Sequence, residues 1–221
     1  IKGLVVMSAE LDAMYTALTL QRVPDVWSSV GYLSLKPLGT WFKDLVARFE
    51  FMESWLKMGP PDAFWMSAFF FPQGYMTAAQ QTYARATKIP IDTLDFRTVV
   101  TKMTSPDDVD RPPEQGVYIY GAYVEGGRWD FDAQCLAESS PKETHVYMPV
   151  MWLDPVVKDL SAPRDPDVYD CPFYKVSSRA GTLSTTGHST NFVRQLQLPT
   201  GAQRPEHWVR RSVALLSQLD E

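Results

Sequence analysis

Apolar residues recur at intervals of three and four between residues 8 and 88, a spacing that predicts a set of amphipathic helices. Ser8 is a suitable N-cap for a first helix, which ends before Pro24. A longer helix is predicted over 38–58, where Gly59 and two prolines stop it. We expect two apolar faces, formed by Leu11, Met14, Tyr15 and Leu18 in the first helix and by Leu38, Trp41, Phe42, Leu45, Phe49, Met52 and Leu56 in the second. The charged residues of the second helix mostly lie off its apolar face: Lys43, Asp44, Arg48, Glu50 and Glu53.

A third helical region is predicted over 61–88. Pro61 suits its first turn, and Pro72 is expected to break or kink it in the middle. Aromatic residues surround the break on nearly every side: Phe64, Trp65, Phe69, Phe70 and Phe71. This helix is therefore expected to be the central one.

After Pro90 the pattern changes to short runs of period two between clusters of glycine, proline and aspartate, which is typical of strands. The candidate strands are 95–100, 117–125, 128–130, 146–153, 173–176, 191–198 and 212–219. Gly126 and Gly127 can turn the chain between two of them as a hairpin. The run at 212–219 also fits a helix. Together these patterns predict an α+β chain with a helical subdomain at 1–91 and an antiparallel sandwich or barrel at 92–221.

Composition narrows the class of protein. The 221 residues are 45% hydrophobic and 21% charged, which is ordinary for a globular chain and excludes global disorder. A net charge of -5 argues against a nucleic-acid or membrane partner. The apolar run at 63–71 is too short to cross a bilayer. Cys135 and Cys171 are too few for a disulfide scaffold and form no CxxC pair, so a reducing compartment is expected. Because the chain begins at Ile1 without a leader pattern, we expect it to be part of a longer protein.

The segment 181–191, rich in glycine and hydroxyl groups, is the strongest candidate for chemistry. A phosphate-binding loop needs lysine where His188 stands and one residue less between Gly181 and Gly187. A serine nucleophile at Ser189 lacks the final glycine of its usual turn, and a loop or sheet edge explains the segment without a substrate.

Other candidates for chemistry have equally plain structural explanations. The histidines are isolated, so no zinc site is predicted. Glu125 and Asp130 are either paired carboxylates for glycoside chemistry or charged ends of a hairpin. Asp107, Asp108 and Asp110 lack the spacing of a calcium loop. Four aromatic residues are either a stacking platform or core, and core is favoured: Tyr118, Tyr120, Trp129 and Trp152.

Seven segments in a fixed order resemble the C-terminal domain of dynein heavy chains, in particular the axonemal branch. They are SLKPLGTW (34–41), GPPDAFW (59–65), IPIDTL (89–94), GVYIYGAYVEGGRWD (116–130), MPVMWL (148–153), CPFYK (171–175) and the region 207–219. None of them is a catalytic signature, but together they span nearly the whole chain. The segment 181–193 is similar to that of single-headed inner-arm heavy chains.

The resemblance implies a helical part followed by a small antiparallel β-barrel, with the last segment as a barrel strand whose one side carries Val209, Val213, Leu215 and Leu219. In this family the domain lies across the AAA+ ring of the same heavy chain, braces it and modulates its coupling. The implied parent is the minus-end-directed, ATP-driven microtubule motor of cilia and flagella. It works in the cytoplasm at the axoneme, with intermediate and light chains.

The resemblance places ATP and magnesium in upstream modules, so no catalytic, cofactor or metal residue is expected in this fragment. Some Trp and Phe residues of the helical part, foremost Trp41, Trp55 and Phe64, are expected to be exposed and to dock on the ring. The alternative is a free-standing β-barrel module that binds a carbohydrate or a protein.

Overall fold

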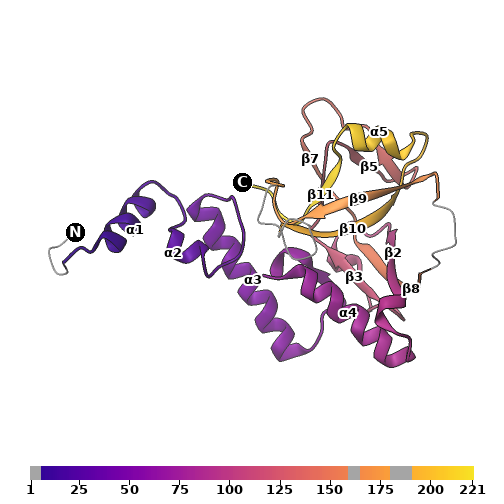
Figure 1. Cartoon of the computed structure of the whole chain (residues 1–221), viewed down its shortest axis with the longest axis horizontal. Helices are drawn as coiled ribbons and strands as arrows, with labels where there is room; N and C mark the ends of the chain where they lie inside the picture. The colour runs from indigo at the N-terminus through magenta and orange to yellow at the C-terminus, as the bar shows by residue number, and fades with distance from the viewer. Residues whose placement is uncertain (1–5, 159–164, 180–190) are drawn as a thin grey trace.

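The computed structural model describes residues 6–158, 165–179 and 191–221 (Figure 1). Its helices are α1 (Ala9–Thr19), α2 (Asp25–Ser28), α3 (Leu38–Met58), α4 (Pro72–Thr87) and α5 (Pro205–Arg210), with three 3-10 turns at Met66–Ala68, Ile91–Thr93 and Pro106–Asp108. Its strands are β1 (Ala63–Trp65), β2 (Leu94–Val100), β3 (Val117–Tyr120), β4 (Tyr123–Glu125), β5 (Arg128–Asp130), β6 (Cys135–Ala137), β7 (His145–Tyr147), β8 (Met151–Val157), β9 (Val168–Tyr174), β10 (Phe192–Pro199) and β11 (Ala214–Leu216).

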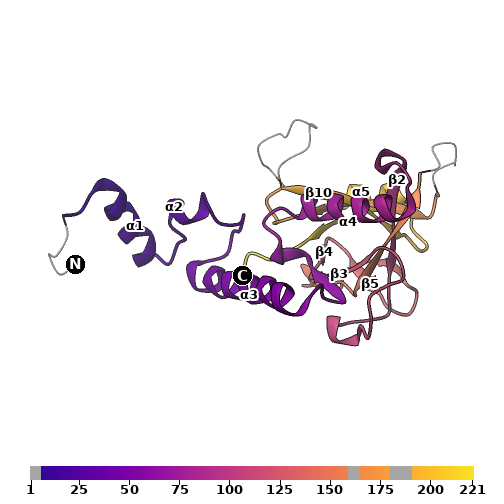
Figure 2. The same ribbon diagram turned by 90° about the horizontal axis from the view of Figure 1, so that it is seen from below.

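The first three helices lie to one side of the sheets, with α1 farthest away (Figures 1 and 2). The hydroxyl of Ser8 accepts a hydrogen bond from the backbone N–H of Leu11 at 3.3 Å, so the predicted N-cap is confirmed. Helix α3 has the predicted bounds and ends at Gly59, whose φ of 94° suits glycine.

The single helix expected over 61–88 is wrong in its first part. Residues 63–65 form strand β1, which pairs in parallel with β3, and a 3-10 turn follows. Pro72 does break the region, as one of the two predicted outcomes, and it begins helix α4, because the first turn of a helix needs no N–H from proline.

The strands form three sheets. Their orders are β1-β3-β8-β2, β10-β9-β11-β4-β7 and β5-β6. Two of the described ladders are parallel, β1 with β3 and β9 with β11, so the purely antiparallel arrangement expected from the sequence is wrong for these pairs. The ladders of the described strands do not trace a closed barrel, so the barrel stays a prediction.

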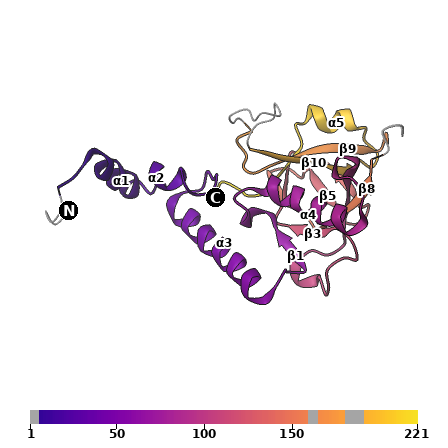
Figure 3. The same ribbon diagram turned by 60° about the horizontal axis from the view of Figure 1, so that its bottom comes forward.

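Side chains join the two larger sheets where β2 and β10 face each other. Arg194 on β10 pairs with Asp95 on β2, and the N–H of Gln197 donates to the hydroxyl of Thr98 at 3.2 Å. One hydrophobic core lies between these sheets, and it includes Met76 of α4, which packs against the strands (Figure 3). The helical part thus contributes directly to the core of the sheets.

The run 212–219, which fitted either a strand or a helix, contains a strand, and a short helix precedes it. Pro205 begins the short helix α5, and Ala214–Leu216 form β11 between β9 and β4. The predicted strand face is wrong for Val209, which lies in the helix and is 61% exposed, whereas Leu215 is fully buried. Among the described residues, no helix has the length and apolar character needed to cross a membrane.

Candidate docking surface on helix α3

Helix α3 has two different faces on roughly opposite sides. The inner face turns towards the rest of the protein, and the outer face carries apolar side chains in solvent. Residues three or four positions apart share a helix face. The inner face consists of Trp41, Asp44, Arg48, Phe51 and Trp55, and the outer stripe of Phe42, Val46, Phe49 and Leu56.

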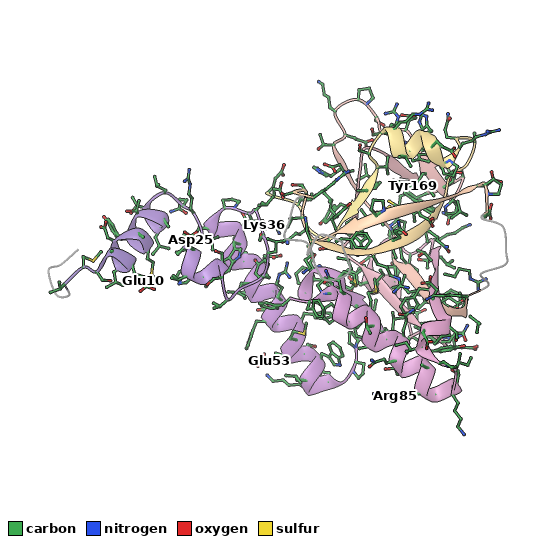
Figure 4. All side chains as sticks on the ribbon, in the orientation of Figure 1. Glu10, Asp25, Lys36, Glu53, Arg85 and Tyr169 are labelled. Carbon is green, nitrogen blue, oxygen red and sulfur yellow. The ribbon has the colours of Figure 1, made fainter. Side chains whose placement is uncertain are left out.

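The outer stripe is uncovered along the length of the helix. The side chains of Phe42, Val46, Phe49 and Leu56 are 57%, 40%, 66% and 88% exposed. Glu53 lies on the same side and pairs with Lys57 at 2.8 Å in solvent (Figure 4 labels Glu53 in the second half of α3). A row of exposed apolar side chains of this kind is typical of a surface that another protein or segment covers.

The inner face of the second half of α3 packs in an aromatic cluster. The ring of Trp55 lies edge-on to Phe64 at a centroid distance of 5.2 Å and to Phe69 at 6.1 Å. Tyr75 of α4 stacks on Phe69 at 4.2 Å. These edge-to-face and stacked contacts fix the end of α3 against β1 and α4.

The inner face of the first half is polar and buried. Arg48, 2% exposed, donates from Nε to Asp44 Oδ2 at 2.8 Å, and its guanidinium lies 3.7 Å from the centre of the Tyr32 ring. Lys36 Nζ donates to Asp44 Oδ1 at 3.3 Å (Figure 4 labels Lys36 before α3). Arg48 Nη2 donates to Gln218 Oε1 at 3.3 Å. We call these five residues the Arg48 cluster.

Burial in the Arg48 cluster changes the pKa of Tyr32. Desolvation, followed by the negative charge of Asp44, raises the pKa of Tyr32 well above its ordinary value. The Tyr32 hydroxyl donates to the carbonyl of Trp41 at 2.7 Å, so it stays protonated as a structural donor. A cavity of about 220 Å³ adjoins the cluster and is lined by Lys36, Asp44, Gln218 and their neighbours.

The structure brings two of the three residues expected to dock on a ring, Trp55 and Phe64, into contact and places Trp41 near the other end of α3. Trp41 is 4% exposed because Tyr32 and Trp27 stack on it, and Phe64 is 9% exposed beneath Trp55 and Tyr75. Trp55 is partly buried. The exposure expected of Trp41 and Phe64 is therefore wrong for this protein, and a docking role for the three residues stays a prediction.

The apolar face predicted for α3 is also corrected. The prediction placed Trp41 on the same face as Phe42, Phe49 and Leu56, but the structure places only the last three on the outer stripe. The prediction also left out Arg48, which is buried. A signal for the true inner face was present, because Asp44 and Arg48 are an ion pair at i and i+4 between Trp41 and Trp55.

Helix α1 is a second uncovered element. None of its residues is buried, and Leu11 and Tyr15 are 39% and 45% exposed. On the apolar side predicted for this helix, Leu11 and Tyr15 are exposed, whereas Met14 and Leu18 are partly buried. A helix of 11 residues gains little stability without tertiary packing.

The other candidates for chemistry have structural partners. Asp108 accepts from the backbone N–H groups of Thr104 and Ser105, both at 2.9 Å, which lowers its pKa. Glu125 pairs with Arg179 at 2.5 Å, and Asp130 accepts from the backbone of the turn that follows β5. In the described part of the sequence, no three His, Cys, Asp or Glu side chains are grouped to hold a metal ion.

The two thiols are not activated. Burial raises the pKa of Cys171, and burial together with the charge of Asp130 raises that of Cys135. Cys135 lines an open hollow of about 650 Å³ beside Trp208. Trp129 is a core residue, and the Trp152 indole donates to the carbonyl of Gln115 at 2.9 Å. Ser189 and His188 lie outside the described residues.

The structure is that of an α+β domain with an exposed apolar stripe on α3. Residues 1–217 match the family described as the C-terminal domain of dynein heavy chains, and the protein belongs to that family. It is 50% identical over 221 residues to dynein axonemal heavy chain 1 of Rattus norvegicus, 47% identical over 221 residues to dynein axonemal heavy chain 12 of Homo sapiens and 44% identical over 220 residues to dynein axonemal heavy chain 3 of Homo sapiens.

Each of these alignments spans 100% of this sequence but only 5–7% of the relative. The 221 residues therefore span only a small part of the length of these relatives.

Proposed function

We propose that this protein is the C-terminal domain of an axonemal dynein heavy chain, and that it lies across the AAA+ ring of the same polypeptide, braces the ring and modulates the coupling between its modules. Family membership supports the setting. The outer stripe of α3 carries the docking role, because it presents four apolar side chains to solvent from a helix whose other face is firmly held.

The parent protein would be the minus-end-directed microtubule motor of cilia and flagella, located in the axoneme. ATP and magnesium would bind in its upstream modules, and other parts would contact the microtubule and the intermediate and light chains. The axonemal names of the relatives support this location. The large difference in length supports a ring-bound domain over the alternative, a free-standing β-barrel that binds a carbohydrate or a protein.

In this proposal the domain itself has no catalytic role. Incubation of the purified domain with ATP and magnesium is expected to give no phosphate release above background. Turnover that depends on magnesium would contradict this part of the proposal. A fluorophosphonate probe should likewise leave Ser189 unlabelled, and labelling would favour a hydrolase.

The docking role is tested by adding the purified domain to a motor ring that lacks its own C-terminal domain. Phe49→Asp should weaken this binding at least tenfold, because it places a charge in the apolar contact. Ser54→Asp is the matched control, since Ser54 is an exposed residue of α3 off the stripe and the change in charge is the same. Equal binding by both variants would exclude the outer stripe as the docking surface.

A further inference from the structure

The polypeptide returns to α3 directly after it leaves the middle of the five-stranded sheet. Strand β11 lies between β9 and β4, and Ser217 follows it. The backbone N–H of Ser217 donates to the carbonyl of Tyr174 at 2.9 Å, and its hydroxyl donates to the carbonyl of Lys175 at 3.0 Å. These two hydrogen bonds fix Ser217 to the sheet. The next residue is Gln218.

Gln218 links three parts of the fold with one amide. It is 5% exposed. Its Nε2 donates to the carbonyl of Leu33 at 2.5 Å, in the loop before α3, while its Oε1 accepts from Arg48 in the middle of α3. Both polar atoms of the side chain are therefore used, and a buried amide with both partners has one favoured orientation.

We propose that Gln218 and Arg48 are a positioning pair that fixes the rotation of α3 relative to the five-stranded sheet and so holds the outer stripe outward. The consequence of this pair for the motor rests on the docking function proposed above. Gln218 does not lie on the stripe; it acts through Arg48, which projects from the opposite face of the same helix.

The two attachments of α3 hold different halves of the helix and meet at Trp65, whose ring lies 5.8 Å from the Arg48 guanidinium and 6.3 Å from the Phe51 ring. The aromatic cluster holds the second half through Phe51 and Trp55. The Arg48 cluster holds the first half, through Asp44, Arg48 and Tyr32. Removal of the Gln218 amide should therefore loosen residues 38–50 more than residues 51–58.

Hydrogen exchange of the 221-residue protein tests this difference. Gln218→Ala is expected to speed amide exchange in residues 38–50 about tenfold, in line with the loss of a hydrogen bond to a charged group. Exchange in β8 and β9 should stay within about twofold of the native rate. Glu221→Gln, at an exposed position of the same tail, is the control and should change neither region.

Two further variants separate positioning from a general loss of stability. Gln218→Glu keeps an acceptor for Arg48 but loses the donor to the Leu33 carbonyl, so it should restore part of the protection of residues 38–50 that Gln218→Ala removes. Arg48→Met should loosen the same residues, and the effects of Arg48→Met and Gln218→Ala should be less than additive in the double variant, because the two changes share the hydrogen bond between Arg48 and Gln218.

Unchanged exchange in residues 38–50 of Gln218→Ala would overturn the inference, as would additive effects in the double variant. If Arg48→Met does not fold, the comparison of Gln218→Ala with Gln218→Glu still decides. The proposed function fails separately: if α3 loosens as expected but Phe49→Asp binds the ring normally, the positioning pair stands and the docking role does not.

Discussion

The two faces of α3 differ in what they are made of and in what covers them. The inner face contains an arginine and an aspartate, yet it is buried, whereas the outer face contains two phenylalanines, yet it is exposed. Hydrophobicity alone would predict the reverse at these positions. The inner polar groups can be buried because each has a hydrogen-bond or ion-pair partner. The outer apolar side chains are exposed because few of the described residues pack against them.

Adjacent residues of α3 provide the sharpest test of this contrast. Trp41→Ala should lower the free energy of unfolding by about 4 kcal/mol, because it removes a buried ring stacked on Tyr32. Phe42→Ala, one position along on the outer stripe, should change it by less than about 0.5 kcal/mol. Urea denaturation followed by circular dichroism measures both. Similar losses in the two variants would show that the outer face is covered within this protein.

The Arg48 cluster should be the next most sensitive part. Asp44→Asn leaves two buried cations, Arg48 and Lys36, without their carboxylate, and should cost about 3 kcal/mol. Asp62→Asn, an exposed carboxylate before β1, is the control and should cost less than about 0.5 kcal/mol. A loss no greater than that of the control would mean that the polar inner face contributes little to holding α3.

The sequence predicted most local elements of this fold but not how they combine. Helix α3 was found because Gly59 and the prolines mark its end, and β2, β5 and β10 were found from their period of two. The run 61–71 was misassigned because apolar residues on every side do not distinguish a buried helix from a buried strand. Strand β1 owes its state to a parallel partner, β3, which lies far along the sequence.

The candidate docking surface was harder to predict than the helices and strands, because its orientation depends on contacts between residues far apart in the sequence. The inner face of α3 can be both polar and buried because its arginine has a distant partner. Arg48 donates a hydrogen bond to Gln218, which lies 170 positions further along the sequence. A helical pattern describes which residues share a face, but it does not tell which face the rest of the protein covers. For that reason Trp41 and Phe64 were expected to be exposed and are buried.

Alkaline pH should weaken the aromatic cluster that holds the second half of α3. Burial raises the pKa of Tyr75 above its ordinary value of 10.0. The folded protein therefore keeps a proton that the unfolded protein loses, so this contribution to stability is complete below pH 10.0 and falls as the pH rises further. The hydroxyl has no hydrogen-bond partner among the described residues.

Tyr75→Phe tests this directly. It removes an unpaired buried hydroxyl and should raise the free energy of unfolding at about pH 8 by about 1 kcal/mol. The loss of stability above pH 10.0 should also become smaller, though not vanish, because burial raises the pKa of Tyr32 and Tyr169 in the same direction. Urea midpoints at several pH values measure both effects, with the exposed Tyr15→Phe as control. An unchanged alkaline loss would exclude Tyr75 as a contributor.

The smallest effect is expected for an ion pair beside the outer stripe. Glu53 and Lys57 form an ion pair at i and i+4 in solvent, and such pairs contribute about 0.3–0.5 kcal/mol in low salt. Glu53→Gln should lower stability by about that amount, and the difference should disappear in high salt because exposed charges are screened. A larger, salt-independent loss would mean that Glu53 is held by contacts within the protein. The outer face would then resemble the inner one, and the contrast between the two faces of α3 would no longer hold.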